Sequence, residues 1–123
     1  MMRWLLTSAL ALSSLACAAT PTEPTTPSPP ACSVKLWACT STYGAIAYSP
    51  STGAMGIAYN HGARADADAA AIGFCSKADC VTVAYFSNSC GAIATAPTGQ
   101  MATGTGNSGD TAQAFALSSC LLK

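Results

Sequence analysis

The chain has 123 residues, of which half are hydrophobic and only 8% are charged, with five basic and five acidic side chains. A protein that binds nucleic acid needs clustered Lys and Arg to neutralise phosphates, so this composition excludes that class of partner. Alanine makes up much of the apolar fraction and buries little area per residue. A domain of this size would therefore have a marginal core that needs further stabilisation.

The first 19 residues are predicted to be a signal peptide. Arg3 is followed by an apolar stretch over residues 4–12, which is too short to cross a bilayer. Two cleavage sites compete, because Ala16-Cys17-Ala18 fits an ordinary signal peptidase, whereas Ser14-Leu15-Ala16-Cys17 resembles a lipoprotein box. Only the second leaves Cys17 in the product, where it would be acylated.

Residues 20–31 are predicted to be a linker rich in threonine and proline. Between Thr20 and Pro30 there are five prolines and four threonines, so we expect an extended spacer that is partly polyproline-like. Such a spacer suits a domain held away from a membrane by lipidated Cys17, and two acyl chains would make that attachment stable. We favour a membrane-anchored lipoprotein of the cell envelope, and free secretion stays open.

An internal repeat organises residues 32–123, which we expect to form one globular domain. The segment 44–75 returns as 91–120, and both copies begin with Gly-Ala-Ile-Ala. Further along, the aligned pairs are Pro50 with Pro97, Thr52 with Thr98, Gly53 with Gly99, Met55 with Met101, and Cys75 with Cys120. The match predicts a duplicated unit that is used twice in one fold.

Each unit is predicted to be a hairpin followed by a helix. In the first unit, residues 45–48 and 55–60 are the expected strands around the turn at residues 49–53. Residues 63–75 alternate, but alanine favours helix over strand, and Asp66 and Asp68 suit the first turns of a helix. In the second unit, Ser108 is the expected N-cap of a helix over residues 110–119, which contributes Phe115 and Leu117 to the core.

Residues 80–86 separate the two units and have the alternation of a strand. Residues 87–89 are the expected turn, so this strand would pair with the start of the second hairpin at Gly91. The fold class is therefore α+β: a small disulfide-stabilised domain with a mainly antiparallel sheet of about five strands and two helices on one face.

Six of the seven cysteines lie in the predicted domain. They are Cys32, Cys39, Cys75, Cys80, Cys90 and Cys120. An even number in an exported chain predicts three disulfides, and the spacings with a single histidine do not make a zinc site. Many pairings are possible, and we favour Cys75–Cys80, Cys90–Cys120 and Cys32–Cys39.

Several short segments, taken in order, characterise a family. They are Tyr43 to Pro50, then Arg64-Ala-Asp-Ala-Asp-Ala-Ala-Ala, Asp79-Cys80-Val81 and Phe86 to Ala92. Over about residues 38–120 the chain resembles the bacterial exported family called domain of unknown function 4189. The family usually has Glu where this chain has Asp66 and Asp68, and aromatic residues near the segment 55–57. The resemblance implies secretion, disulfides and a fold, with no established reaction.

Four residues are candidate partner contacts: Arg64, Tyr48, Tyr59 and His61. His61 precedes the first helix and could act as a general base with Asp66 or Asp68, although an exposed turn histidine is the simpler interpretation. Arg64 opposes the helix dipole, so it either pairs with Asp68 or presents its guanidinium to an anionic partner. No residue pattern indicates a catalytic, cofactor or metal site.

The sequence favours a noncatalytic module that binds an unknown protein or envelope component, with no cofactor. The alternative is a small inhibitor or immunity-type protein that inserts Asn88-Ser89 into an envelope hydrolase. A weak hydrolase that uses His61 is a third hypothesis.

Overall fold

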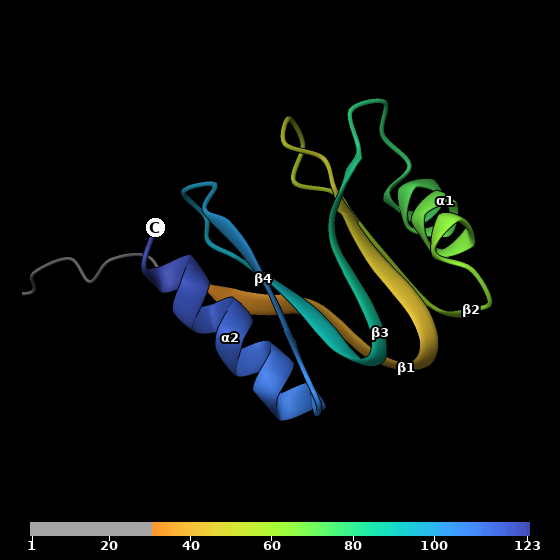
Figure 1. The fold of residues 1–123 in the computed structure, drawn as a ribbon. Coiled ribbons are helices and arrows are strands. Elements are labelled where there is room, and N and C mark those ends of the chain that lie inside the picture. The colour runs from red at the N-terminus through yellow and green to blue at the C-terminus, as the bar shows by residue number, and fades with distance from the viewer. Residues whose placement is uncertain (1–30) are drawn as a thin grey trace, which may run out of the picture.

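The computed structural model describes residues 31–123, so the predicted signal peptide, the linker up to residue 30 and Cys17 lie outside the described residues. Its elements follow the order β1 (Ser33–Tyr48), β2 (Met55–His61), α1 (Arg64–Cys75), β3 (Val81–Thr95), β4 (Met101–Gly106) and α2 (Gly109–Leu121). The strands form one antiparallel sheet in the order β2-β1-β3-β4 (Figure 1). The α+β class is confirmed.

The described residues contain four strands and not about five, because two segments that were expected to be separate strands form one continuous strand. The expected strand at residues 80–86 and the first strand of the second hairpin are both parts of β3. Asn88 has a positive φ of 48°, which lets the chain bend without ending the strand. β1 also begins earlier than expected, at Ser33. The alternation of apolar Val34 and Leu36 with exposed Lys35 is the sequence feature that indicates this earlier start of the strand.

β3 pairs along its whole length with β1, so the expected pairing of residues 80–86 with Gly91 is wrong. Its first part lies beside the end of β1, with Val81 opposite Tyr48. Its second part lies beside the start of β1, with Thr95 opposite Ser33. The register shifts near the middle of β1, between Thr40 and Tyr43. Figure 1 shows both central strands bending at this point, so that the sheet has two halves.

Each half has the same order of elements: a long strand, an edge strand and a helix. In the first half, Ala45 and Ala47 pack with Ala67 and Ala71 of α1. In the second half, alanines of β3 and α2 pack in the same way, namely Ala92, Ala94, Ala112 and Ala116. Small side chains allow each helix to lie close to its strands, as the alanine-rich composition predicted.

The opposite face of the sheet holds the largest buried side chains. Ile46 lies between Ala45 and Ala47 in sequence but belongs to a separate cluster with Phe86 and Ile93. Since neighbouring residues of a strand point to opposite faces, both helices lie on the face away from this cluster. The predicted placement of two helices on one face is therefore confirmed.

Glycines set how closely α1 and α2 approach the edge strands. A Cβ on Gly56 of β2 would lie 2.3 Å from the carbonyl oxygen of Ala71. A Cβ on Gly104 of β4 would lie 2.4 Å from the carbonyl oxygen of Ala112. Neither position has room for a side chain, so each helix is seated directly on the backbone of its edge strand.

The helix N-termini match the sequence predictions. The hydroxyl of Ser108 accepts a hydrogen bond from the backbone N–H of Thr111 and caps α2, whereas Ala63 gives α1 no side-chain cap. Leu117 packs against the core of its half. Phe115, expected in the core, is instead 54% exposed. The narrow helix–sheet spacing leaves space for alanine on the inner side of α2, and Phe115 is on the outer side.

Three disulfides connect the six domain cysteines: Cys32–Cys120, Cys39–Cys90 and Cys75–Cys80. The pairing of Cys75 with Cys80 was predicted. The pairings of Cys32 with Cys39 and of Cys90 with Cys120 were wrong. Because residues 33–39 are extended, Cys32 and Cys39 lie about 23 Å apart along β1, well beyond disulfide range. Cys39 instead faces Cys90 directly across the central strand pair.

Candidate functional site

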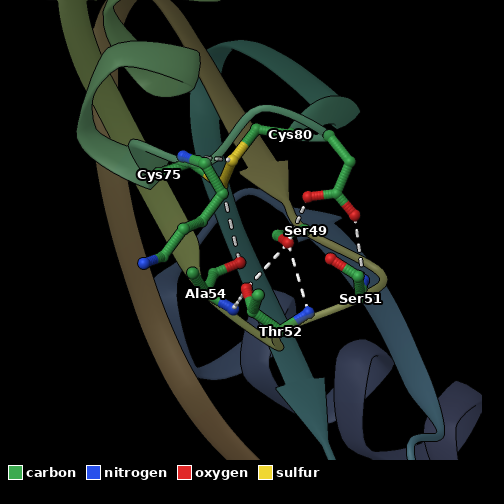
Figure 2. The surroundings of a disulfide bond; sticks show 8 residues. Ser49, Ser51, Thr52, Ala54, Cys75 and Cys80 are labelled. Carbon is green, nitrogen blue, oxygen red and sulfur yellow. Dashed lines mark hydrogen bonds between the residues drawn. A yellow bond between two sulfur atoms is a disulfide. The ribbon is translucent and has the colours of Figure 1, made fainter.

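A hydrogen-bonded cluster fixes the β1–β2 turn next to the Cys75–Cys80 disulfide (Figure 2). The hydroxyl of buried Ser49 donates to Asp79 at 2.6 Å, and the backbone N–H of Ser51 donates to the other carboxylate oxygen at 2.9 Å. The hydroxyl of Thr52 donates to that of Ser49 at 2.7 Å. The cluster ties the turn to the loop between α1 and β3, next to the start of β2.

These hydrogen bonds change the acidity of Asp79. Donation from the Ser49 hydroxyl, with a second contribution from Ser51, lowers the pKa of the Asp79 carboxyl from 3.8 to about 2. The charged form is therefore favoured by the fold. Its stabilising contribution is complete above pH 4 or so, and it is lost as the pH falls toward about 2.

Asp79→Asn is expected to lower stability at neutral pH and to have a progressively smaller effect as the solution is acidified from about pH 4 to about pH 2. Denaturant unfolding of both proteins across this range measures the difference. Asp110→Asn is the matched control, because Asp110 is an exposed carboxylate in the first turn of α2. A difference between wild type and Asp79→Asn that does not narrow in acid would contradict the role given to these hydrogen bonds.

A cleft of about 520 Å³ runs along β2 in the described part of the chain. We call it the β2 groove. Its lining comes from β2, from one residue of β1 and from one residue of α1: Leu36, Met55, Gly56, Ile57, Ala58, Tyr59, His61 and Phe74. Gly56 and Ala58 face α1, whereas Met55 and Ile57 pack on the opposite face with Leu36. Because both faces of β2 contribute, the groove follows the free edge of the strand.

Two aromatic side chains of the β2 groove are unusually exposed. Tyr59 is 50% exposed and Phe74 is 67% exposed. Among residues 31–123, β2 is an edge strand of the sheet, so the backbone groups on its outer side have no partner strand in this part of the chain. Apolar side chains beside an unpaired strand edge are typical of a surface that receives another polypeptide.

The second half of the domain lacks this apolar character at the equivalent places. With Met55 aligned to Met101, Ile57 and Tyr59 correspond to Thr103 and Thr105 of β4. With Cys75 aligned to Cys120, Phe74 corresponds to Ser119. Both halves build the same layers, so the apolar side chains of the β2 groove are not a requirement of the fold.

His61 is the last residue of β2, and it is opposite Tyr43 of β1. It is partly buried and lines the β2 groove, so its expected place in an exposed turn is wrong. The strand extends further than the sequence indicated because β1 pairs with it as far as Tyr43. The hydrogen-bond donors to Asp68 are the hydroxyls of Thr82 and Tyr85. Asp68 is therefore engaged by Thr82 and Tyr85, which does not support the hypothesis that it orients His61 as a general base.

Arg64 begins α1 and interacts with an aromatic ring. Its guanidinium carbon is 3.7 Å from the centroid of the Tyr85 ring. Asp68, the ion-pair partner expected one turn along, is hydrogen-bonded to Thr82 and Tyr85, and no Arg64–Asp68 ion pair forms within the described residues. Arg64 therefore makes a cation–π contact with Tyr85 instead of the expected ion pair with Asp68.

Tyr48 lies apart from the other candidates, in a cleft of about 280 Å³ between the β1–β2 and β3–β4 turns. It also packs against the cluster around Ile46. Of the four candidate contact residues, Tyr59 and His61 share the β2 groove, while Tyr48 and Arg64 lie elsewhere. Phe74 and Leu36 also line the β2 groove, and neither was predicted from the sequence. Phe74 aligns with Ser119 of the second half, and this difference between the two halves could have identified Phe74 as a residue that the common fold does not need.

The Asn88–Ser89 segment does not form a turn between strands. Both residues lie within β3, and Ser89 is opposite Thr40 of β1. Polar residues of this kind are typical of a chain reversal, but here the positive φ of Asn88 gives a bend inside a paired strand. The inhibitor hypothesis therefore loses the protruding turn on which it was based.

Two properties of the described residues bear on other kinds of site. Residues 31–123 contain no cluster of three or more His, Cys, Asp or Glu side chains that could hold a metal ion. Neither α1 nor α2 is long and apolar enough to span a membrane.

Comparison with known proteins gives one family. The family model described as Domain of unknown function (DUF4189) matches residues 43–122. Searches of curated proteins and of solved structures give no match.

Proposed function

Since the chain belongs to the DUF4189 family, whose description includes no activity, we propose from the geometry of this member that it is a noncatalytic binding module. Its β2 groove receives an extended apolar segment of a partner protein. The observation that supports this function is the groove of about 520 Å³ along a free strand edge, with exposed Tyr59 and Phe74 beside it. A peptide that adds to the edge of β2 would hydrogen-bond to the strand and bury these two rings.

The setting of this function is the bacterial cell envelope or the surrounding medium. Three disulfides are typical of proteins in an oxidising compartment. Export by the signal peptide and attachment through lipidated Cys17 are part of the proposal, and they would place the groove where it meets other envelope proteins.

The lining of the β2 groove favours binding over catalysis. Among its lining residues, His61 is the one side chain of a type that commonly acts as a general acid or base. Serine, cysteine and threonine nucleophiles are absent from the lining residues of the described groove, and so are carboxylates. The apolar and aromatic side chains can instead contribute the buried contacts that dominate binding energy in protein interfaces.

Peptides selected from a displayed random library on the oxidised protein are expected to bind the β2 groove. In the variant Tyr59→Thr with Phe74→Ser, they should bind at least about tenfold more weakly, because two aromatic contacts are lost. Both replacements copy residues that the second half already has at equivalent positions, so the fold should accept them. Fluorescence anisotropy with labelled peptide measures the affinities.

Phe115→Ser is the matched control for this experiment. Phe115 is 54% exposed on α2 and does not line the β2 groove, so its loss should leave peptide affinity within about twofold. Selection of peptides that bind wild type and the double variant equally well would reject the β2 groove as the binding site.

A further inference from the structure

A second cleft, of about 320 Å³, lies beside the start of α1. We call it the Arg64 cleft. Its lining residues are Tyr43, Arg64, Tyr85, Phe86 and Ser87. These residues come from β1, β3 and α1, which the fold brings together at one place. The cleft shares no lining residue with the β2 groove.

The Arg64 side chain is held in place by an aromatic ring. Its guanidinium lies over the Tyr85 ring, with 3.7 Å from its central carbon to the ring centroid. The Tyr85 hydroxyl donates a hydrogen bond to Asp68 at 3.0 Å, which fixes the ring. A guanidinium that stacks on a ring keeps its N–H groups around its rim, where they remain able to donate to a ligand.

The position of Arg64 in sequence is unfavourable for the helix itself. As the first residue of α1, it places a positive charge at the positive end of the helix dipole. The arginine therefore does not stabilise α1 through the dipole. Its exposed guanidinium, stacked on Tyr85 at the wall of a cleft, instead fits a role in recognition.

The lining of the cleft defines the chemistry of its ligand. Arg64 is the one charged residue among the described lining residues, and Tyr43 and Tyr85 are 40% and 38% exposed. A carboxylate matches the fork of a guanidinium, and a planar apolar group can pack on the tyrosine rings. Asp68 accepts a hydrogen bond from the Tyr85 hydroxyl, so its negative charge is close to the cleft and repels a dianion such as phosphate more strongly than a monoanion.

We propose that the Arg64 cleft binds a monoanionic carboxylate that has an aromatic group. A cleft of about 320 Å³ is at the lower end of the size range of ligand sites, so the ligand is small or is the last residue of a polypeptide. A free aromatic acid and a C-terminal phenylalanine or tyrosine share this chemistry. This site is additional to the peptide-binding function of the β2 groove.

Nuclear magnetic resonance titration of the oxidised, isotope-labelled protein tests the proposal. N-acetyl-phenylalanine is expected to shift the signals of Arg64, Tyr85 and Ser87 saturably, with a dissociation constant of about 1 mM. Its amide, which lacks the carboxylate, should produce no saturable shift, and inorganic phosphate should bind at least about tenfold more weakly. A peptide that ends in phenylalanine separates the two sources: tighter binding assigns a polypeptide C-terminus, and equal binding assigns the free acid.

Arg64→Gln should weaken the binding of N-acetyl-phenylalanine about tenfold. Lys77→Gln is the control, because it removes the same charge from an exposed residue outside the cleft and should leave the affinity unchanged. Equal affinity of Arg64→Gln and wild type would overturn the proposal. So would equal binding of acid and amide to wild type, a result that does not depend on how any variant folds.

Discussion

Replacing Cys32 and Cys120 together by alanine is expected to lower the free energy of unfolding by about 4–5 kcal/mol. This disulfide closes a loop with a sequence separation of 88 residues and joins the start of β1 to the end of α2. A crosslink over so long a loop removes much conformational freedom from the unfolded chain. The alanine-rich core provides little hydrophobic stabilisation to replace it.

Chemical denaturation of the purified oxidised proteins measures this effect. The double replacement of Cys75 and Cys80 by alanine is the comparison, because its loop separation is only 5 residues and its expected cost is about 2 kcal/mol. Full reduction of all three disulfides should unfold the domain. Equal costs for the two double variants would contradict the dependence on loop length, and a reduced protein that stays folded would show that the core alone supports the fold.

Phe86→Ala is expected to cost about 3–5 kcal/mol of stability. Phe86 is 4% exposed and packs with Ile46 and Ile93 at the bend of the sheet. Its ring occupies the space above two glycines: a Cβ on Gly44 would lie 2.4 Å from the ring, and a Cβ on Gly91 would lie 2.5 Å from it. Removal of the ring would leave a cavity where both central strands bend.

Thermal and denaturant unfolding of Phe86→Ala provides the measurement, with Phe115→Ala as the control. Phe115 is 54% exposed, so its truncation should change stability by only about 0.5 kcal/mol. Gly91→Ala is expected to destabilise by about 1–3 kcal/mol, because the new methyl group meets the Phe86 ring. A cost for Phe86→Ala as small as that for Phe115→Ala would contradict the packing described at the bend.

Local features of this fold were predictable from the sequence, since each is encoded by neighbouring residues. The alanine-rich segment Arg64–Cys75 forms α1, and Ser108 caps α2. Cys75 forms a disulfide with Cys80 across a short loop. In each case the residues that decide the structure are within about a dozen positions of one another. Propensity, capping and loop length are therefore sufficient.

Long-range features were not predictable in the same way. The pairing of β3 with β1 depends on the bend at Asn88, which a turn-like sequence does not distinguish from a chain reversal. The two wrong disulfide pairings have the same long-range origin, because they depend on how β1 extends and on which strand lies beside it. Once β1 and β3 are placed side by side, Cys39 lies opposite Cys90, and Cys32 is left for Cys120.

The candidate site was predicted only in part, for a related reason. Tyr59 and His61 lie on one strand and share the β2 groove, but Phe74 and Leu36 reach it from α1 and β1. Their convergence depends on how the helix and the central strand are packed. Differences between the two halves are informative here, because a residue that one half uses and the other omits is not needed for the common fold.

The measurement that most directly tests the central claim is amide hydrogen exchange of the oxidised protein with and without a selected peptide. If the peptide adds to the edge of β2, the amides of Met55–His61 that do not bond to β1 should gain protection, while the β4 edge is unchanged. Protection confined to β4, to the turns or to α2 would show that the β2 groove is not where a partner protein binds.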